Sequence, residues 1–234
     1  MKNYYVPDNL LTYDNAKTSK GEKLGVLTGI LYLAPSDLSG VDLCPHASPG
    51  CRAACLFTAG RGAFENVHNA RLNKTGYFLE DRAAFLIQLE REIERAVKRS
   101  KLLGLTLAVR LNGTSDIAWE LITGIIQKFS HVQFYDYTKS LARLRKKLPE
   151  NYDFTFSRSE TNDAECIEAL KLGFRVAAIF DSLDSAFNVA DSVELVDGDL
   201  HDIRFLDKPD VIVALKAKGK ARRDESGFVI RGAA

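Results

Sequence analysis

Short apolar runs alternate with longer amphipathic segments along most of the chain, and few folds are compatible with that alternation. The runs are rich in β-branched and aromatic residues, as strands are, and they span residues 24–33, 105–111, 132–137, 152–156, 175–180, 203–206 and 211–215. Strands that alternate with helices predict a parallel sheet covered by helices. We therefore expect an α/β fold, in the form of a partial or complete (βα) barrel of the TIM-barrel type.

The longest helical segment spans residues 63–99. It has Phe85, Leu89 and Ile93 at four-residue spacing with charged residues between them, which is typical of a helix that packs on a sheet. We expect this segment to break near residues 74–76, where a glycine follows a threonine.

Length and composition favour one globular domain. With 234 residues, of which 46% are hydrophobic, the chain can bury a substantial core, so we expect a single domain over residues 1–234, with residues 1–23 as an N-terminal hairpin or cap. The formal net charge of +1 provides no global field that would attract nucleic acid or lipid headgroups. Because no apolar run approaches the roughly 20 residues of a membrane span, we expect a cytoplasmic protein without membrane contact.

Three of the four cysteines, Cys44, Cys51 and Cys55, occupy one short segment directly after the first apolar run. In a reducing compartment, closely spaced cysteines are more often metal ligands or redox groups than disulfides. Thiolates bind soft and borderline metals, so the sequence predicts a metal site formed by these three residues. Cys166 is isolated within a helical pattern, and we expect it to be a small buried residue.

The identity of the metal depends on the fourth ligand. Three cysteines in one loop can hold a four-iron, four-sulfur ([4Fe-4S]) cluster and leave one iron open to a substrate or a nonprotein ligand. Zinc is the alternative metal, with His46 or His68 as the fourth ligand. The C-x6-C-x3-C spacing has no second cysteine pair, which favours the cluster, and Arg52 and Arg61 would offset its negative charge.

Polar side chains follow the predicted strands where these end. In parallel α/β barrels this edge carries the active site, and the cysteine segment opens onto it. We expect catalytic groups among Asp116, Asp136, Arg158, Asp181 and Lys216. Further acid and base groups at the same edge are Tyr137, Lys139 and Glu160.

Two basic segments have different expected roles. The cationic run at residues 143–147 is expected to be a solvated helix face. The second basic segment comprises Lys216, Lys218, Lys220, Arg222 and Arg223. It either lines a rim that holds phosphate or carboxylate, or forms a frayed tail.

The cysteine loop after the first strand, with the repeated βα units behind it, resembles the radical S-adenosylmethionine (SAM) enzymes. The whole sequence from residues 15–21 through residues 109–116 is also similar to a family of bacteriophage-encoded proteins with this kind of loop, which would place the protein in the host cytoplasm. The first resemblance implies a SAM molecule on the open iron, an external electron donor and a deoxyadenosyl radical. By position, Asn112, Ser115 and Asp116 would bind the SAM amino group, and Arg158 or Lys216 its carboxylate.

The sequence departs from the radical SAM pattern at two places. Those enzymes usually space their cysteines as C-x3-C-x2-C with an aromatic residue before the last one, where this chain has Ala54. The Gly-Gly-Glu segment that usually holds the SAM amino group is replaced by residues 111–116. Barrel and cluster are therefore better supported than SAM.

Two classes of function remain open. The first is an iron–sulfur enzyme, resembling the radical SAM enzymes, that acts on a small or nucleotide-like substrate. The second is a cluster protein without SAM, or a zinc-bearing binding protein, that contacts nucleic acid or a host protein through residues 216–223. Binding through phosphate contacts would be strongly salt-dependent, whereas enzymatic turnover would depend on the cluster.

Overall fold

The structure is a computed structural model that describes residues 4–14, 16–184, 186 and 194–232. The chain forms two compact units. The first contains Met1–Pro45, Phe64–Asp136 and Pro149–Asp153, and the second contains His46–Ala63, Tyr137–Leu148 and Phe154–Ala234. Two of the strands contribute residues to both units, so the expectation of a single domain stays a prediction.

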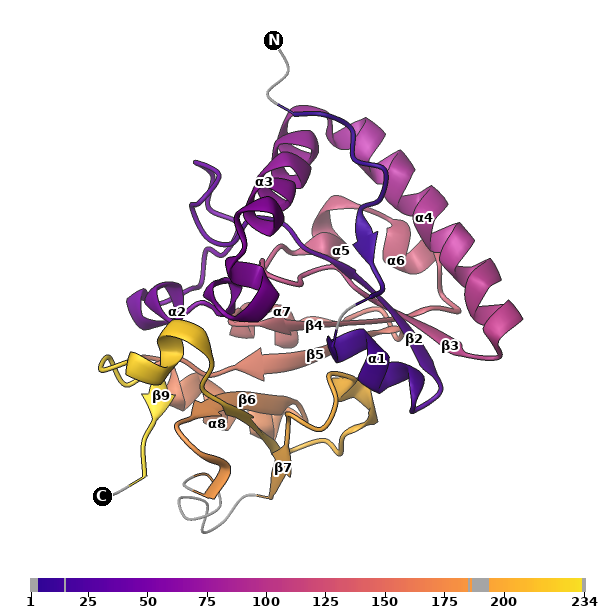
Figure 1. The fold of residues 1–234 in the computed structure, drawn as a ribbon. Helices are drawn as coiled ribbons and strands as arrows, with labels where there is room; N and C mark the ends of the chain where they lie inside the picture. Colours follow the sequence, from indigo (N-terminus) through magenta and orange to yellow (C-terminus); the bar gives the residue numbers. More distant parts are fainter. Residues whose placement is uncertain (1–3, 15, 185, 187–193, 233–234) are drawn as a thin grey trace. The chain divides into compact units, whose positions relative to one another are not determined.

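A mostly parallel sheet runs through the described residues (Figure 1). Its strands are β1 (Leu11–Thr12), β2 (Val26–Leu31), β3 (Thr106–Arg110), β4 (Gln133–Thr138), β5 (Tyr152–Ser157), β6 (Arg175–Phe180), β7 (Leu195–Asp197), β8 (Ile212–Lys216) and β9 (Val229–Ile230). Their order is β1-β2-β3-β4-β5-β6-β8-β7, and β9 pairs with β6. The pairing of β1 with β2 is antiparallel, whereas β2 with β3, β3 with β4, β5 with β6 and β6 with β8 are parallel.

The prediction of a mixed α/β fold with a parallel sheet is confirmed, but a closed barrel is wrong. Among the described strands the hydrogen-bonded path ends at β1 on one side and at β7 on the other. Strand β1 is antiparallel to its neighbour and only two residues long, so it ends the sheet instead of continuing it.

The helices of the first unit are α1 (Ala16–Glu22), α3 (Glu65–Glu80), α4 (Arg82–Leu103), α5 (Trp119–Ile122) and α6 (Ile125–Lys128). Helices α3 and α4 pack on each other, and α4 also contacts β3. The face of α4 with Phe85, Leu89 and Ile93 is fully buried, as its periodicity predicts. Complete burial of each such side chain stabilises the fold by about 1.5–3 kcal/mol.

The long helical segment breaks at Asp81 and not near residues 74–76. Thr75 continues α3 because its hydroxyl donates to the carbonyl of Arg71 (2.9 Å) and accepts the backbone N–H of Ala34 (2.8 Å). The carboxylate of Asp81 accepts the N–H of Ala84 (3.3 Å) and so begins α4. The side-chain cap therefore decides the boundary.

The N-terminal segment is tied to α4 by a buried carboxylate. Glu92 is 3% exposed and accepts the backbone N–H groups of Leu10 (2.8 Å) and Leu11 (2.9 Å). The expected hairpin or cap is therefore a short edge strand, β1, followed by α1.

The second unit contains α2 (Pro49–Ala53), α7 (Leu141–Leu144) and α8 (Asp163–Lys171), with the short 3-10 helices η1 (Leu56–Thr58), η2 (Gly60–Ala63), η3 (Arg204–Leu206) and η4 (Gly219–Arg223). The predicted strand at residues 203–206 is wrong. Arg204 is 1% exposed and pairs with Asp207 (3.0 Å) three residues later, a spacing that suits a helical turn.

The cationic run at 143–147 is only partly solvated. Arg143 is 6% exposed and lies over the ring of Phe154 (4.5 Å to the centroid), so the prediction is wrong for this residue. Arg145 is exposed as expected and pairs with Glu168 (2.7 Å). None of the described helices is long and apolar enough to cross a bilayer.

Candidate functional site

Cys44 lies in the irregular segment that follows β2 in the first unit, against the loop that follows β3. Its Sγ accepts the backbone N–H of Ser36 (3.3 Å) and donates to the carbonyl of Thr114 (3.8 Å). The N–H of Asp116 donates to the carbonyl of Leu43 (2.8 Å), which fixes the same loop beside Cys44. The structure thus brings the first cysteine and the polar tip of β3 together.

The loop after β3 is organised by Asn112, which is 2% exposed. Its Oδ1 accepts hydrogen bonds from the Ser115 hydroxyl (2.8 Å), the Ile117 N–H (2.9 Å) and the Trp119 indole (3.1 Å). Its Nδ2 donates to the carbonyl of Ile117 (3.0 Å). Asn112 and Ser115 were predicted to bind the SAM amino group. Their bonds to each other and to the loop give them a structural role, and the SAM contact stays a prediction.

Asp136, at the end of β4, is buried to 1% exposure. It accepts the N–H of Asn112 (2.8 Å) and the hydroxyl of Tyr152 (2.7 Å), and Arg110 lies 3.9 Å away. A carboxylate in this position neutralises a buried guanidinium and joins the ends of β3, β4 and the start of β5. Its predicted catalytic role is untested, and its contacts are those of a structural group.

Gly113 explains why the loop after β3 comes so close to β2. A Cβ at this position would lie 2.6 Å from Tyr32 Cδ1, 2.7 Å from the Leu31 carbonyl oxygen and 2.8 Å from Ile30 Cγ2. Its own N–H donates to the Leu31 carbonyl (2.9 Å). Only glycine fits this approach of backbone to backbone.

Cys51 and Cys55 belong to the second unit, on α2 and directly after it. Cys51 packs against an apolar cluster formed by Ala54, Ala217, Ala221, Phe228 and Val229. Helix α2 begins at Ser48, whose hydroxyl oxygen accepts the N–H of Cys51 (3.2 Å), with Pro49 in the first turn. This is the N-terminal pattern that Ser followed by Pro predicts.

Glu160, just beyond the end of β5, fastens the start of α2. Its carboxylate accepts the hydroxyl of Ser48 (2.6 Å) and the N–H of Gly50 (2.7 Å). Burial alone would raise the pKa of Glu160, but the hydrogen bonds from Ser48, from its own backbone N–H and from Gly50 outweigh it and hold the pKa below 4.5, its usual value. The sequence suggested Glu160 only as an acid or base group.

Gly50 lies close to the same carboxylate. A Cβ there would meet Ser226 Oγ and lie 2.8 Å from the Glu160 carboxyl, so a larger residue would displace these side chains. The cysteine segment of the second unit is therefore held by residues far away in the sequence, which no local pattern could reveal.

Arg158 holds the C-terminal segment of the second unit. It pairs with Asp163 (2.9 Å) and donates to the carbonyls of Gly227 (2.8 Å) and Phe228 (3.2 Å). Lys139 donates to the hydroxyl of Ser157 (2.8 Å) and lies over the ring of Phe228 (5.6 Å). These contacts place both cations beside the end of β5, and their predicted roles stay predictions.

The remaining predicted residues differ in their surroundings. Asp181 accepts the N–H of Ser182 (2.7 Å) at the end of β6. Lys216 is exposed at the end of β8. His46 is exposed and His68 half-buried. Cys166 is 8% exposed, as predicted, and burial raises the pKa of its thiol to about 12.

The donor chemistry of the three clustered cysteines fits a soft metal or an iron–sulfur cluster. Cys44, Cys51 and Cys55 form no disulfide and are partly exposed, and the N–H bond to Cys44 Sγ is of the kind that stabilises a thiolate. Within the described part of the chain, no three His, Cys, Asp or Glu side chains stand together as a ready metal site. Cys44 belongs to the first unit and the other two cysteines to the second.

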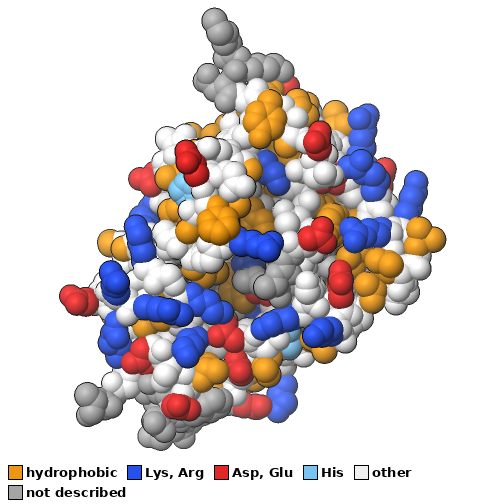
Figure 2. Space-filling model, in the orientation of Figure 1, with side chains coloured by type: hydrophobic (Ala, Val, Ile, Leu, Met, Phe, Trp, Pro, Cys, Tyr) orange, Lys and Arg blue, Asp and Glu red, His pale blue; other side chains and the backbone are white. Residues whose placement is uncertain are grey.

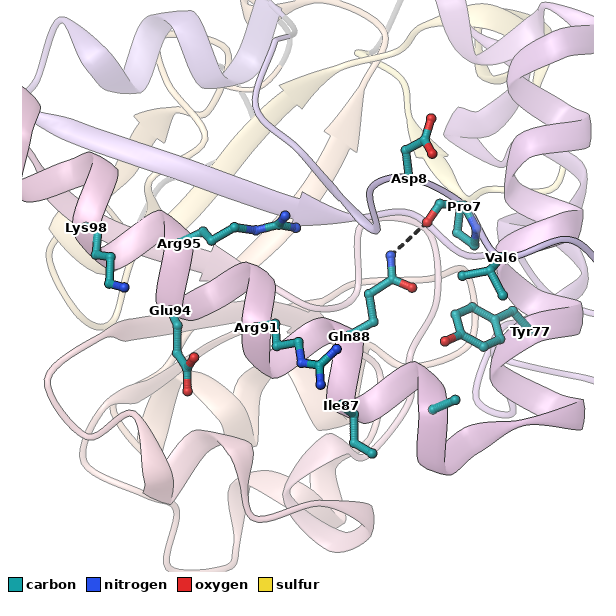
Figure 3. A pocket seen from close by; sticks show the side chains of 11 residues that line it. Val6, Pro7, Asp8, Tyr77, Ile87, Gln88, Arg91, Glu94, Arg95 and Lys98 are labelled. Carbon is teal, nitrogen blue, oxygen red and sulfur yellow. Dashed lines mark hydrogen bonds between the residues drawn. The ribbon is translucent and has the colours of Figure 1, made fainter.

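A groove of the first unit lies elsewhere. It has a volume of about 680 Å³ and runs along α4 beside residues 6–8, where Gln88 donates to the Pro7 carbonyl (2.8 Å) (Figure 3). Its charged lining comes from Asp8 and from Arg91, Glu94, Arg95 and Lys98 on α4. None of the predicted site residues lines it, so this groove is not the expected site.

A sequence model of the family described as gene product 88 matches residues 9–232. Searches of curated proteins and of solved structures found no match. The family match agrees with the expected resemblance to bacteriophage-encoded proteins, whereas it carries no link to the radical SAM enzymes.

Proposed function

The chain belongs to the gene product 88 family, and from the side chains of this member we propose that it binds an iron–sulfur cluster through Cys44, Cys51 and Cys55. One contrast among the cysteines carries the proposal. The three clustered cysteines form no disulfide and are partly exposed, whereas Cys166 is buried and burial raises the pKa of its thiol. A partly exposed thiol loses its proton and reaches a metal more readily than a thiol in apolar surroundings.

Neighbouring residues of the same unit hold each proposed cysteine ligand in position. In the first unit, the N–H of Ser36 and the loop after β3 orient Cys44. In the second unit, Glu160 and Ser48 fix the start of α2, and the apolar cluster around Ala54 and Phe228 shields one side of Cys51 from water. At metal sites, the residues around the ligands fix the orientation of the ligands and lower the local dielectric constant.

The order of the strands supports the finer proposal of an enzyme resembling the radical SAM enzymes. From β2 to β6 each strand neighbours the next one in sequence, and β8 follows β6. Doubly wound sheets reverse their strand order at a switch point, whereas barrels and partial barrels do not. The cysteine segment follows β2, the first strand of this parallel series.

When bound, a cluster with three cysteine ligands supplies one open iron, a Lewis acid or a donor of single electrons. The chain's own groups near the strand ends include Lys139 and Arg158, both fixed by hydrogen bonds in the second unit. They favour an anionic group on the substrate, which agrees with a small or nucleotide-like molecule.

Metal and sulfide analysis of protein purified without oxygen tests the proposal. We expect brown protein with a broad absorbance band at about 400 nm and about four irons and four sulfides per chain. One tightly held zinc and no sulfide would overturn the cluster. The finer proposal is tested by adding SAM and a reductant and measuring the release of 5′-deoxyadenosine. If iron-loaded protein releases none, the SAM-dependent reaction is rejected and the proposed cluster is not affected.

A further inference from the structure

The basic segment near the C-terminus is part of the folded surface and not a frayed tail. Ala221 in η4 is 3% exposed and packs in the apolar cluster with Ala54 and Phe228. Gly219 has a φ of +57° and lies so close to Ala59 that a Cβ would be 2.9 Å from the Ala59 Cβ. Helix η4 is therefore seated against the segment that follows Cys55.

Further bonds hold the backbone of η4. The guanidinium of Arg231 donates to the carbonyls of Arg222 (3.3 Å) and Asp224 (2.7 Å). The carboxylate of Asp224 accepts the N–H of Val229 (3.0 Å). The side chains of η4 are thus presented on a fixed turn.

Five cations in this part of the second unit point to solvent without an ionic partner, and we call them the basic surface. They are exposed, and none forms an ion pair with a described residue: Arg61, Lys216, Lys220, Arg222 and Arg223. Figure 2 shows Lys and Arg side chains gathered over the segment that Figure 1 draws in yellow.

The acidic groups nearby neutralise little of this charge. Asp199 pairs with Lys218 (2.6 Å), which is outside the basic surface. Asp224 is 9% exposed and directs its carboxylate to Val229 and Ser226. Glu225 is the one exposed acid between residues 216 and 231, so positive charge remains in excess there.

We propose that the basic surface binds the phosphate backbone of nucleic acid. Protein interfaces have an apolar core and membrane anchors need apolar side chains. No large hydrophobic side chain is exposed among the described residues 207–232, and around Arg61 only Leu56 (48% exposed) and Phe64 (58% exposed) are. Interfaces with nucleic acid are polar and positive. Arginine contributes a planar fork that matches phosphate oxygens, and three of the five cations are arginines.

The test uses the full chain and fluorescence anisotropy with a labelled single-stranded oligonucleotide and a duplex of the same sequence, over a series of salt concentrations. The variant Arg222→Gln with Arg223→Gln removes two phosphate contacts. We expect weaker binding and a slope of log affinity against log salt that becomes shallower by about 1.4 for the single strand or about 1.8 for the duplex.

The variant Lys146→Gln with Lys147→Gln is the matched control, because both lysines are exposed and unpaired in the same unit but outside the basic surface. It should bind like the wild type. Equal loss in both variants, a salt-independent affinity, or equal displacement of the oligonucleotide by polyglutamate would overturn the proposal. Preferential binding to phosphatidylserine vesicles would also overturn it.

Binding to nucleic acid does not depend on the cluster. The Cys44→Ala variant, which removes hydrogen bonds to Ser36 and Thr114 in the first unit, should lose iron and retain oligonucleotide binding, whereas the arginine variant should retain iron. Failure of one proposal is therefore distinguishable from failure of the other.

Discussion

Glu160 connects two distant parts of the second unit, because its carboxylate holds Ser48 and Gly50 at the start of α2. We predict that Glu160→Gln lowers the free energy of unfolding by about 1–2 kcal/mol, since hydrogen bonds to a charged acceptor are stronger than those to a neutral amide. Denaturant unfolding at pH 7 measures the change. Glu150→Gln, at an exposed position, is the control and should be neutral.

The difference in unfolding free energy between the wild type and Glu160→Gln should also depend on pH. The pKa of Glu160 is lowered in the folded state, so its stabilisation is complete above 4.5, its usual value, and is lost as the pH falls through the folded-state value. The stability difference between wild type and Glu160→Gln should therefore shrink below about pH 4.5. A difference that stays constant down to acid pH would contradict the role given to the charge.

Asp136 is predicted to matter for stability more than for chemistry. Asp136→Asn should lower the free energy of unfolding by about 2–4 kcal/mol, because it removes the carboxylate charge that faces the buried Arg110. Tyr152→Phe removes one hydrogen bond to the same carboxylate and should cost less. An Asp136→Asn protein as stable as the wild type would show that this network does not hold the strand ends together.

At the residue scale, the sequence identified individual groups better than their partners. Burial of Cys166 follows from helical periodicity, whereas the cysteine segment, expected to be one loop, contains a helix that begins at Ser48 and Pro49. The contacts of Glu160 with Ser48 and of Glu92 with Leu10 join residues far apart in sequence. Such pairs depend on the tertiary fold, so local patterns contain no signal for them.

At the scale of the elements, the loop after β3 approaches the backbone at the end of β2 closely at Gly113. Gly113→Ala should lower the free energy of unfolding by about 1–3 kcal/mol, because the new methyl group meets the backbone oxygen of Leu31 at 2.7 Å. Thermal or denaturant unfolding measures this.

Gly124→Ala is the matched control for Gly113→Ala, since a Cβ there has no neighbour within 4 Å and the backbone φ of −86° suits alanine. It should change stability by less than about 0.5 kcal/mol. Equal effects of both substitutions would mean that the close approach of the loop to β2 is not what restricts residue 113.

The long strands and helices were predicted from periodicity, and the short elements were not. Strands β2 to β6 and β8 match apolar runs, but β7 and β9 have two or three residues and no pattern of their own. The helix break at Asp81 depends on a side-chain cap, which outweighed the glycine signal near residue 76.

At the scale of the whole molecule, the alternation of strands and helices predicted a parallel sheet but not whether it closes. Closure depends on pairing between the first and last strands, and such distant pairing leaves no trace in a single sequence. Sequential strand order is compatible with a partial barrel. The frayed-tail alternative for residues 216–223 failed for a similar reason, because Ala221 is buried by contacts with distant residues.

The central claim is that Cys44, Cys51 and Cys55 bind one iron–sulfur cluster, and iron content per chain in single cysteine variants tests it most directly. Proteins are purified without oxygen, with circular dichroism as a check of folding. We predict about four irons in the wild type and in Cys166→Ala, and loss of most iron in Cys44→Ala, Cys51→Ala and Cys55→Ala. Full iron in any of the last three variants, or loss of iron in folded Cys166→Ala, would contradict the account.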